Sequence, residues 1–200
     1  MYVSPRFPVD PRHAVDLVRR HPFALVVSAD GGVPLATHAP VLVESAVDTS
    51  FVGATLLGHL AHANPQWQGW ERAPAVLVVF AGPHGYVSPT AYRTDPAVPT
   101  WDYAAVHLTG TIEVIPDTGG TLDVVERTVR AMESTRTPQW VPSPASRARF
   151  ADIVGGVVAF RVRVTAERSV FKLSQDQDAA TRARVAADAP PALARLMEDV

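Results

Sequence analysis

The sequence predicts an α+β protein built on a closed antiparallel β-barrel, with helices packed outside the barrel. Three observations predict this fold: about six apolar runs bounded by turn residues, few helical segments between the runs, and an Asp-Gly pair between two of them. Strands that follow one another with few helices between them favour antiparallel pairing, and closure removes the exposed strand edges. A regular alternation of strands and helices, typical of a doubly wound parallel sheet, does not occur.

The N-terminal part of the chain carries clear start and turn signals. Asp10 followed by Pro11 is typical of a helix start, because a carboxylate caps free N–H groups and proline suits the first helical position. Apolar residues 23–28 and 33–43 then predict two strands. The Asp-Gly pair between them predicts a hairpin, since glycine tolerates the positive φ of a tight turn.

The remaining elements follow from periodicity and capping residues. A two-residue alternation or a short apolar run predicts strands at residues 50–57, 75–81, 106–115, 157–165 and 171–174. Capping residues and a helical apolar period predict helices at residues 65–70, 121–132 and 143–154. Gly110 lies inside one of these strands and predicts a β-bulge there.

Two segments show neither the two-residue alternation of a strand nor the apolar period of a helix. Residues 82–100 are rich in proline and glycine and predict a long ordered loop or lid. The tail from Gln177 is rich in alanine and arginine and predicts helix or partial disorder. We therefore expect a barrel domain over residues 1–175 and a C-terminal extension over residues 176–200.

Composition restricts the classes of function. Apolar residues make up 47% of the 200 residues, enough for a sizeable core, and the formal net charge of -2 gives no large basic field for nucleic acid. The chain has no cysteine, which excludes disulfides, thiolate zinc sites and cysteine nucleophiles and fits the cytoplasm. No signal sequence or membrane-spanning apolar run is recognised. We expect a cytoplasmic protein without membrane contact, and direct nucleic-acid binding is disfavoured.

Four polar and aromatic clusters stand where the predicted strands end. In or directly beside them lie five of the seven histidines and three of the four tryptophans. Such a grouping offers stacking surfaces and a few oriented polar groups, which is what a planar aromatic ligand needs. The clusters are residues 36–40, 58–67, 82–89 and 98–107.

Each cluster also has a purely structural interpretation, which the sequence leaves open. His38 could bond a backbone carbonyl, and Trp67 could be a core anchor. His59 and His62 are three residues apart, but no third ligand accompanies them, so no metal site is predicted. No G-x-S-x-G, G-x-G-x-x-G or phosphate-loop pattern occurs, and no catalytic residue can be named.

Together, the four clusters resemble the PaiB-like family of FMN-binding negative transcriptional regulators, relatives of pyridoxamine-phosphate oxidases and flavin reductases. The resemblance begins at Met1-Tyr2, passes through the clusters and ends at residues 172–175, so it covers most of residues 1–175. It implies an antiparallel split β-barrel of the FMN-binding type with peripheral helices. It also implies a homodimer with two flavin sites at the interface between the subunits.

The resemblance assigns the flavin phosphate to the segment after the third strand. His59, His62 and backbone N–H groups near Asn64 are the implied contacts, since a phosphate favours cationic side chains and free N–H groups. His62 stands where the family commonly has arginine or lysine, and a histidine is only partly protonated at neutral pH.

The other contacts implied by the resemblance come from several strands. Thr37 and His38 would meet the isoalloxazine edge, aromatic residues of the partner subunit would close the site, and the last strand would bond the ribityl chain or phosphate. The complete predicted cofactor-binding set is Thr37, His38, His59, Ala61, His62, Asn64, Gln66, Trp67, Trp101, Tyr103, His107, Lys172, Ser174 and Gln175.

The function implied by the resemblance is that of a flavin-dependent sensor or regulator. The sequence shows no DNA-reading element, so regulation would pass through a partner or a metabolite. Two alternatives stay open. One is a flavin-dependent oxidoreductase of the flavin-reductase or pyridoxamine-phosphate-oxidase type, in which FMN performs the hydride chemistry. The other is a haem-binding split barrel with a histidine as axial ligand.

Overall fold

A computed structural model describes residues 1–200, and its central feature is a closed six-stranded antiparallel barrel. Around the ring the strands follow the order β1-β2-β3-β6-β5-β4. The α+β antiparallel barrel predicted from the sequence is therefore confirmed. The strands are β1 (Phe23–Ser28), β2 (Leu35–Val43), β3 (Thr55–Ala61), β4 (Ala75–Val87), β5 (Thr100–Val114) and β6 (Val157–Lys172).

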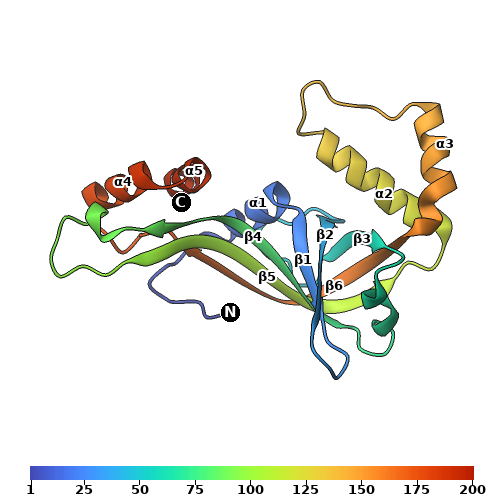
Figure 1. Ribbon diagram of the computed structural model, residues 1–200, viewed down its shortest axis with the longest axis horizontal. Coiled ribbons are helices and arrows are strands. Elements are labelled where there is room, and N and C mark those ends of the chain that lie inside the picture. The colour runs from blue at the N-terminus through green and yellow to red at the C-terminus, as the bar shows by residue number, and fades with distance from the viewer.

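Two pairs of helices lie outside the barrel toward its two ends, and the first helix lies between these pairs (Figure 1). One pair, α2 and α3, lies at the end where β3 and β6 meet, and another pair, α4 and α5, lies over the far part of β4 and β5. The helices are α1 (Pro11–Arg20), α2 (Thr118–Glu133), α3 (Pro144–Ile153), α4 (Ala179–Asp188) and α5 (Pro191–Asp199), with short 3-10 turns η1 (Pro65–Gly69), η2 (Pro89–Ala91) and η3 (Val154–Gly156). None of these helices is both long and apolar enough to cross a membrane.

The core fills the barrel because alternate residues of each strand point inward. Thirty-one buried residues form one continuous cluster that also includes the apolar face of α1. Trp70 and Phe160 meet edge to face at its centre, with ring centroids 5.1 Å apart. A Cβ atom on Gly58 would lie 2.4 Å from the Phe160 ring, so glycine makes room for that ring.

The predicted loop over residues 82–100 is wrong in extent. β4 continues to Val87 and β5 begins at Thr100, so only residues 88–99 leave the sheet, and they contain η2. The pairing of β4 with β5 shifts between Ala81 and His84, where Gly82 and Pro83 stand. A bulge at this point lets the strand continue through residues that otherwise indicate a loop.

The last strands were also predicted too short. β6 runs without a break from Val157 to Lys172, although a turn was expected between residues 165 and 171. Residues 166–170 of β6, where the turn was expected, are all paired with β5. The register of the β5–β6 pairing shifts between Thr109 and Gly110 of β5, where a bulge was predicted. The third strand is displaced toward its C-terminal side, from the predicted residues 50–57 to Thr55–Ala61.

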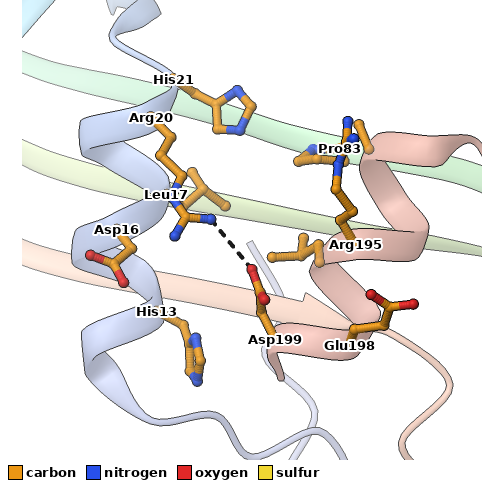
Figure 2. Close-up of a pocket in the computed structure, with 11 residues that line it drawn as sticks. His13, Asp16, Leu17, Arg20, His21, Pro83, Arg195, Glu198 and Asp199 are labelled. Carbon is orange, nitrogen blue, oxygen red and sulfur yellow. Dashed lines mark hydrogen bonds and ion pairs between the residues drawn. The ribbon is translucent and has the colours of Figure 1, made fainter. Parts of the chain in front are cut away.

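The C-terminal tail forms two helices that pack on the barrel. Val185, Leu193 and Met197 belong to the main core cluster. Gly85 of β4 lies directly under the tail, because a Cβ atom there would be 2.9 Å from Cδ of Pro190. Figure 2 shows α1 and α5 facing each other across a cleft of about 690 Å³, with Arg20 and Asp199 paired at 3.4 Å.

Gly110, which lies at the register shift between β5 and β6, gives the sharpest stability test of the fold. A Cβ atom there would lie 2.3 Å from the backbone oxygen of Arg163, and that oxygen cannot move without disturbing the sheet. We expect Gly110→Ala to lower the free energy of unfolding by about 2 kcal/mol or more in denaturant titrations. Gly155→Ala is the matched control, because no atom lies within 4 Å of its Cβ position. Equal stability of the two variants would contradict the bulge geometry.

Candidate functional site

Most of the predicted cofactor-binding residues fall into two groups at opposite ends of the sheet. The barrel-end group surrounds the end of β3, where His59 pairs with Ala159 near the start of β6. The arm-end group surrounds the end of β6, where Lys172 pairs with Tyr103. Lys172 follows Ala159 by thirteen positions along β6, which corresponds to a path of about 40 Å along the strand. The barrel-end group is Thr37, His38, His59, Ala61, His62, Asn64, Gln66 and Trp67, and the arm-end group is Trp101, Tyr103, Lys172, Ser174 and Gln175.

The barrel-end group is organised by Asn64, which caps η1. Its Oδ1 accepts the N–H of Gln66 at 2.9 Å, and its Nδ2 donates to Oγ1 of Thr37 at 2.8 Å. These bonds connect the turn after β3 to β2. Beside them, the exposed ring of His62 lies 5.1 Å from the ring of Trp67, whose Nε1 donates to the His62 carbonyl at 2.9 Å. The imidazole of His62 is therefore exposed and packs against the indole of Trp67, which the hydrogen bond from Nε1 keeps in place.

The backbone N–H groups expected to be free around Asn64 are largely in use. The amide of His62 donates to the carbonyl of Gly156, and that of Asn64 donates to the carbonyl of Ala61. The amide of Gln66 is bonded to the Asn64 side chain. Side chains and the amide of Ala63, rather than these three amides, are therefore the groups left to meet a phosphate in this turn.

His59 is half-buried on β3, and its Nδ1 atom is buried without a hydrogen-bond partner. Burial lowers the pKa of His59 below its ordinary value, so the neutral imidazole is favoured at neutral pH. An unpaired buried polar atom is unfavourable on its own, and a ligand that bonds it relieves that cost. His59 therefore offers a ligand one unused hydrogen-bonding atom rather than a fixed positive charge.

Gln66 has a structural role in addition to its predicted one. Its side chain is only 2% exposed, and Nε2 donates to the carbonyls of Val26 and Leu35 and to Oγ of Ser28. These bonds tie η1 to β1 and β2. The Oε1 atom has no partner in the chain. Contact between Gln66 and a cofactor stays a prediction.

An aromatic surface lies on the outer face of β1 and β2. The rings of His38 and Phe23 stack at 5.4 Å with 17° between their planes, and Phe23 is 66% exposed. His38 pairs with Leu25, Leu25 pairs with Val79, and Val79 pairs with His107, so one row crosses four strands. His107 thus lies between the two groups, on the same row as His38.

The arm-end group is built around Asp102, which is completely buried. Oδ2 of Asp102 accepts the hydroxyl of Ser174 at 2.6 Å, and Oδ1 accepts from Nζ of Lys172 at 3.4 Å. Nζ of Lys172 also donates to the Trp101 carbonyl at 2.8 Å and to Oγ1 of Thr100. Lys172 is the only lysine in the chain, and these contacts fix its ammonium group at the end of β6.

Asp102 was not among the predicted site residues, although it lies in a predicted cluster. Burial raises its pKa, while the bonds from Ser174 and Lys172 act in the opposite direction. Ser174 adopts a left-handed backbone with φ of 55°, which is uncommon for a residue other than glycine. The pairing of Ser174 with Asp102 depends on a contact 72 residues apart in the chain, and no local sequence pattern signals it.

The remaining arm-end residues differ in exposure and in the hydrogen bonds of their side chains. Trp101 is 50% exposed, and its Nε1 donates to Nδ1 of His84 at 3.3 Å. Tyr103 is half-buried between Lys172 and His84 on the neighbouring strands. The Gln175 side chain bonds the backbone of Leu173 and Phe171. Of the two aromatic rings in the arm-end group, Trp101 is thus the more exposed.

The structure contains no group of three or more His, Cys, Asp or Glu side chains placed to hold a metal ion. The charged cleft of Figure 2 contains none of the predicted cofactor-binding residues. The barrel-end group instead presents the His62 and Trp67 rings and the unpaired, buried Nδ1 of His59. The arm-end group presents the Trp101 ring and the fixed ammonium group of Lys172. This fold and donor set define a split β-barrel of the flavin-binding class.

Comparison with known proteins gives the family. The family described as "Putative FMN-binding domain" matches residues 1–166, and the chain belongs to that family. It is 30% identical over 179 residues to the Protease synthase and sporulation protein PAI 2 of Bacillus subtilis, covering 89% of this chain and 84% of the relative. The resemblance to the PaiB-like family is therefore confirmed.

Solved structures of low sequence identity share the fold. The FAD and heme binding protein of Mycobacterium smegmatis superimposes with a TM-score of 0.57 at 17% identity, covering 88% of this chain and 78% of that protein. The flavocytochrome Anf3 of Azotobacter vinelandii gives a TM-score of 0.56 at 16% identity, covering 90% and 80%. The cofactor named by the family, FMN, suits the groups present: a phosphate can meet the exposed imidazole of His62, with His59 half-buried on the strand that precedes it.

The burial of His59 predicts a pH effect on stability. Because its pKa is lowered in the folded chain, the unfolded chain binds more protons at mildly acidic pH, so the free energy of unfolding falls as the pH drops from about 7 to about 5. In His59→Gln this contribution is removed. We expect the variant to lose less stability than the wild type over that range in denaturant titrations. Parallel pH curves for the two proteins would contradict a buried neutral His59.

Removing the carboxylate of Asp102 should destabilise the arm end. In Asp102→Ala the Ser174 hydroxyl and the Lys172 ammonium lose their partner, and we expect the free energy of unfolding to fall by about 2 kcal/mol. Asp102→Asn keeps an acceptor for Ser174 and should recover part of that loss. Thermal and denaturant unfolding of both variants measure the difference, and equal losses would refute the Ser174 bond as the reason.

Proposed function

We propose that this protein binds FMN between two copies of the chain, with the barrel-end group of one copy and the arm-end group of the other forming each site. The observation that carries the proposal is the separation of about 40 Å between the two groups along β6. One copy cannot bring both groups to one FMN molecule. Two copies related by a twofold axis can, and they then form two equivalent sites.

The chemistry of the two groups supports complementary roles. At the barrel end, His59 and His62 offer nitrogen atoms to a phosphate, and the exposed His38–Phe23 stack offers a flat surface. At the arm end, Trp101 offers a half-exposed indole beside the positive charge of Lys172, which three protein acceptors hold in place. When bound, FMN supplies hydride and electron transfer, and the side chains bind and orient it.

The outer face of the sheet supports association of two copies. Phe23 is 66% exposed, and Leu25 and Val79 on the same face are only half-buried. A continuous apolar surface on a β-sheet is typical of a protein–protein contact. We infer that this face contributes to the homodimer and that it adjoins the flavin site through His38 and His107.

The role of the bound flavin is proposed to be that of a sensor in gene regulation in the cytoplasm. The name of the Bacillus subtilis relative, which concerns protease synthesis and sporulation, supports a regulatory role. With a net charge of -2, output through a protein partner or metabolite is favoured over direct contact with DNA. We also keep the division into a barrel domain of residues 1–175 and an extension of residues 176–200 as a proposal.

A mixing experiment tests the shared site directly. One variant carries His59→Ala and His62→Ala, and the other carries Trp101→Ala and Lys172→Gln. Alone, each should bind FMN at least about tenfold more weakly, because charged or oriented contacts are lost. When the two variants are refolded together, half of the dimers are mixed, and each mixed dimer has one intact site. We expect about one quarter of all sites to regain wild-type affinity in FMN fluorescence titrations.

The matched control carries Arg147→Gln and Arg149→Gln on α3, which has no buried residue. It should bind FMN like the wild type. If the mixture of the first two variants regains no high-affinity site, the two groups do not meet between copies and the proposed site is wrong.

The absorbance spectrum of the purified protein separates the candidate cofactors. Bands near about 370 and 450 nm indicate flavin, and one intense band near about 400 nm indicates haem. Oxidation of a reduced nicotinamide or deazaflavin by the FMN-loaded protein would favour the oxidoreductase alternative. A salt-dependent shift of an operator fragment would instead show direct DNA binding and contradict output through a partner.

A further inference from the structure

A cleft of about 720 Å³ opens beside the barrel between α1 and α2. It is enclosed by the last turn of α1, the end of β2 and the last turn of α2, and no predicted cofactor-binding residue lines it. This volume falls in the range of small-molecule sites in proteins. The cleft therefore stands apart from the proposed FMN function and needs its own interpretation.

The floor of the cleft is apolar. Val18 of α1 and Val41 of β2 are each 1% exposed and form its deepest part. Val43 and Met132 are half-buried beside them. A half-open floor of this kind favours the burial of an aliphatic chain or an apolar ring.

The charges at the rim are of one sign. Arg19 and Arg20 are the charged residues that line the cleft, and no acidic residue lines it. Arg19 donates from Nη2 to the carbonyl of Val47, and Arg20 donates from Nη1 to Asp199, so most of their N–H groups are free. Arg19 carries a full positive charge without an acidic partner, and the charge of Arg20 is only partly offset by its exposed pair with Asp199. Together they outweigh the partial negative charge of the nearby helix C-termini. The rim thus favours an anion.

We propose that this cleft is a second ligand site, which binds a small apolar molecule carrying one anionic head group, such as a medium-chain carboxylate. The apolar part lies on Val18, Val41 and Met132. The carboxylate accepts hydrogen bonds from Arg19 and Arg20, whose planar guanidinium groups suit a carboxylate. The proposal requires both parts of the ligand, because the floor offers no polar partner and the rim offers little apolar surface.

Calorimetric titration of the full-length, FMN-loaded protein tests the proposal with three probes. Decanoate carries both parts, 1-decanol lacks the charge, and acetate lacks the chain. We expect saturable binding of decanoate, at least about tenfold weaker binding of decanol, and none of acetate up to about 1 mM. In Arg19→Gln/Arg20→Gln, decanoate should bind about tenfold more weakly while decanol is unchanged.

Two further variants make the test specific. Met132→Glu places a negative charge at the floor and should also weaken decanoate, with FMN binding unchanged. Arg147→Gln/Arg149→Gln should leave decanoate affinity at the wild-type value. Equal affinity for decanoate and decanol, or no effect of the two arginine changes, would overturn the proposal. Loss of the dimer in Met132→Glu would also overturn it, since the cleft would then be an interface between copies.

Discussion

The length of β6 is the constraint on which the arrangement of the candidate site depends. This one strand pairs with β3 at its start and with the extended part of β5 at its end, and it has no break over sixteen residues. Because β5 pairs with it from Phe160 to Lys172, β6 cannot fold back on itself. The two groups that the family resemblance assigns to one flavin are therefore kept about 40 Å apart along β6 in each copy. A shared site between two copies is the arrangement that satisfies both the distance and the residue set.

Buried polar side chains make each group rigid before any ligand arrives. Gln66 ties η1 to two strands through backbone carbonyls, and Asn64 connects the same turn to Thr37. At the other end, Asp102 holds Ser174 and Lys172. Such bonds fix the positions of side chains that would otherwise sample several rotamers, which lowers the entropic cost of binding. The polar atoms of the site are thus presented by strands and by short segments that hydrogen bonds tie to the barrel.

Local sequence patterns were enough to predict the barrel. They could not predict contacts between residues that are far apart in the chain. The helix start at Asp10, the hairpin after β1 and the bulge at Gly110 were all readable, because each depends on a few neighbouring residues. The extension of β4 through Gly82 and Pro83 was missed, since a bulge lets a strand pass residues that usually end it. The buried Asp102 was missed as well, because its burial is decided by Ser174 and Lys172, about seventy residues away.

The most direct test of the shared site is sedimentation velocity of the FMN-saturated protein, recorded at the flavin absorbance near about 450 nm. The account predicts that the flavin signal travels with a particle of twice the mass of the chain and that this particle holds two FMN molecules. A flavin signal that travels at full occupancy with a single chain would contradict it, because the barrel-end and arm-end groups of one copy cannot reach the same ligand.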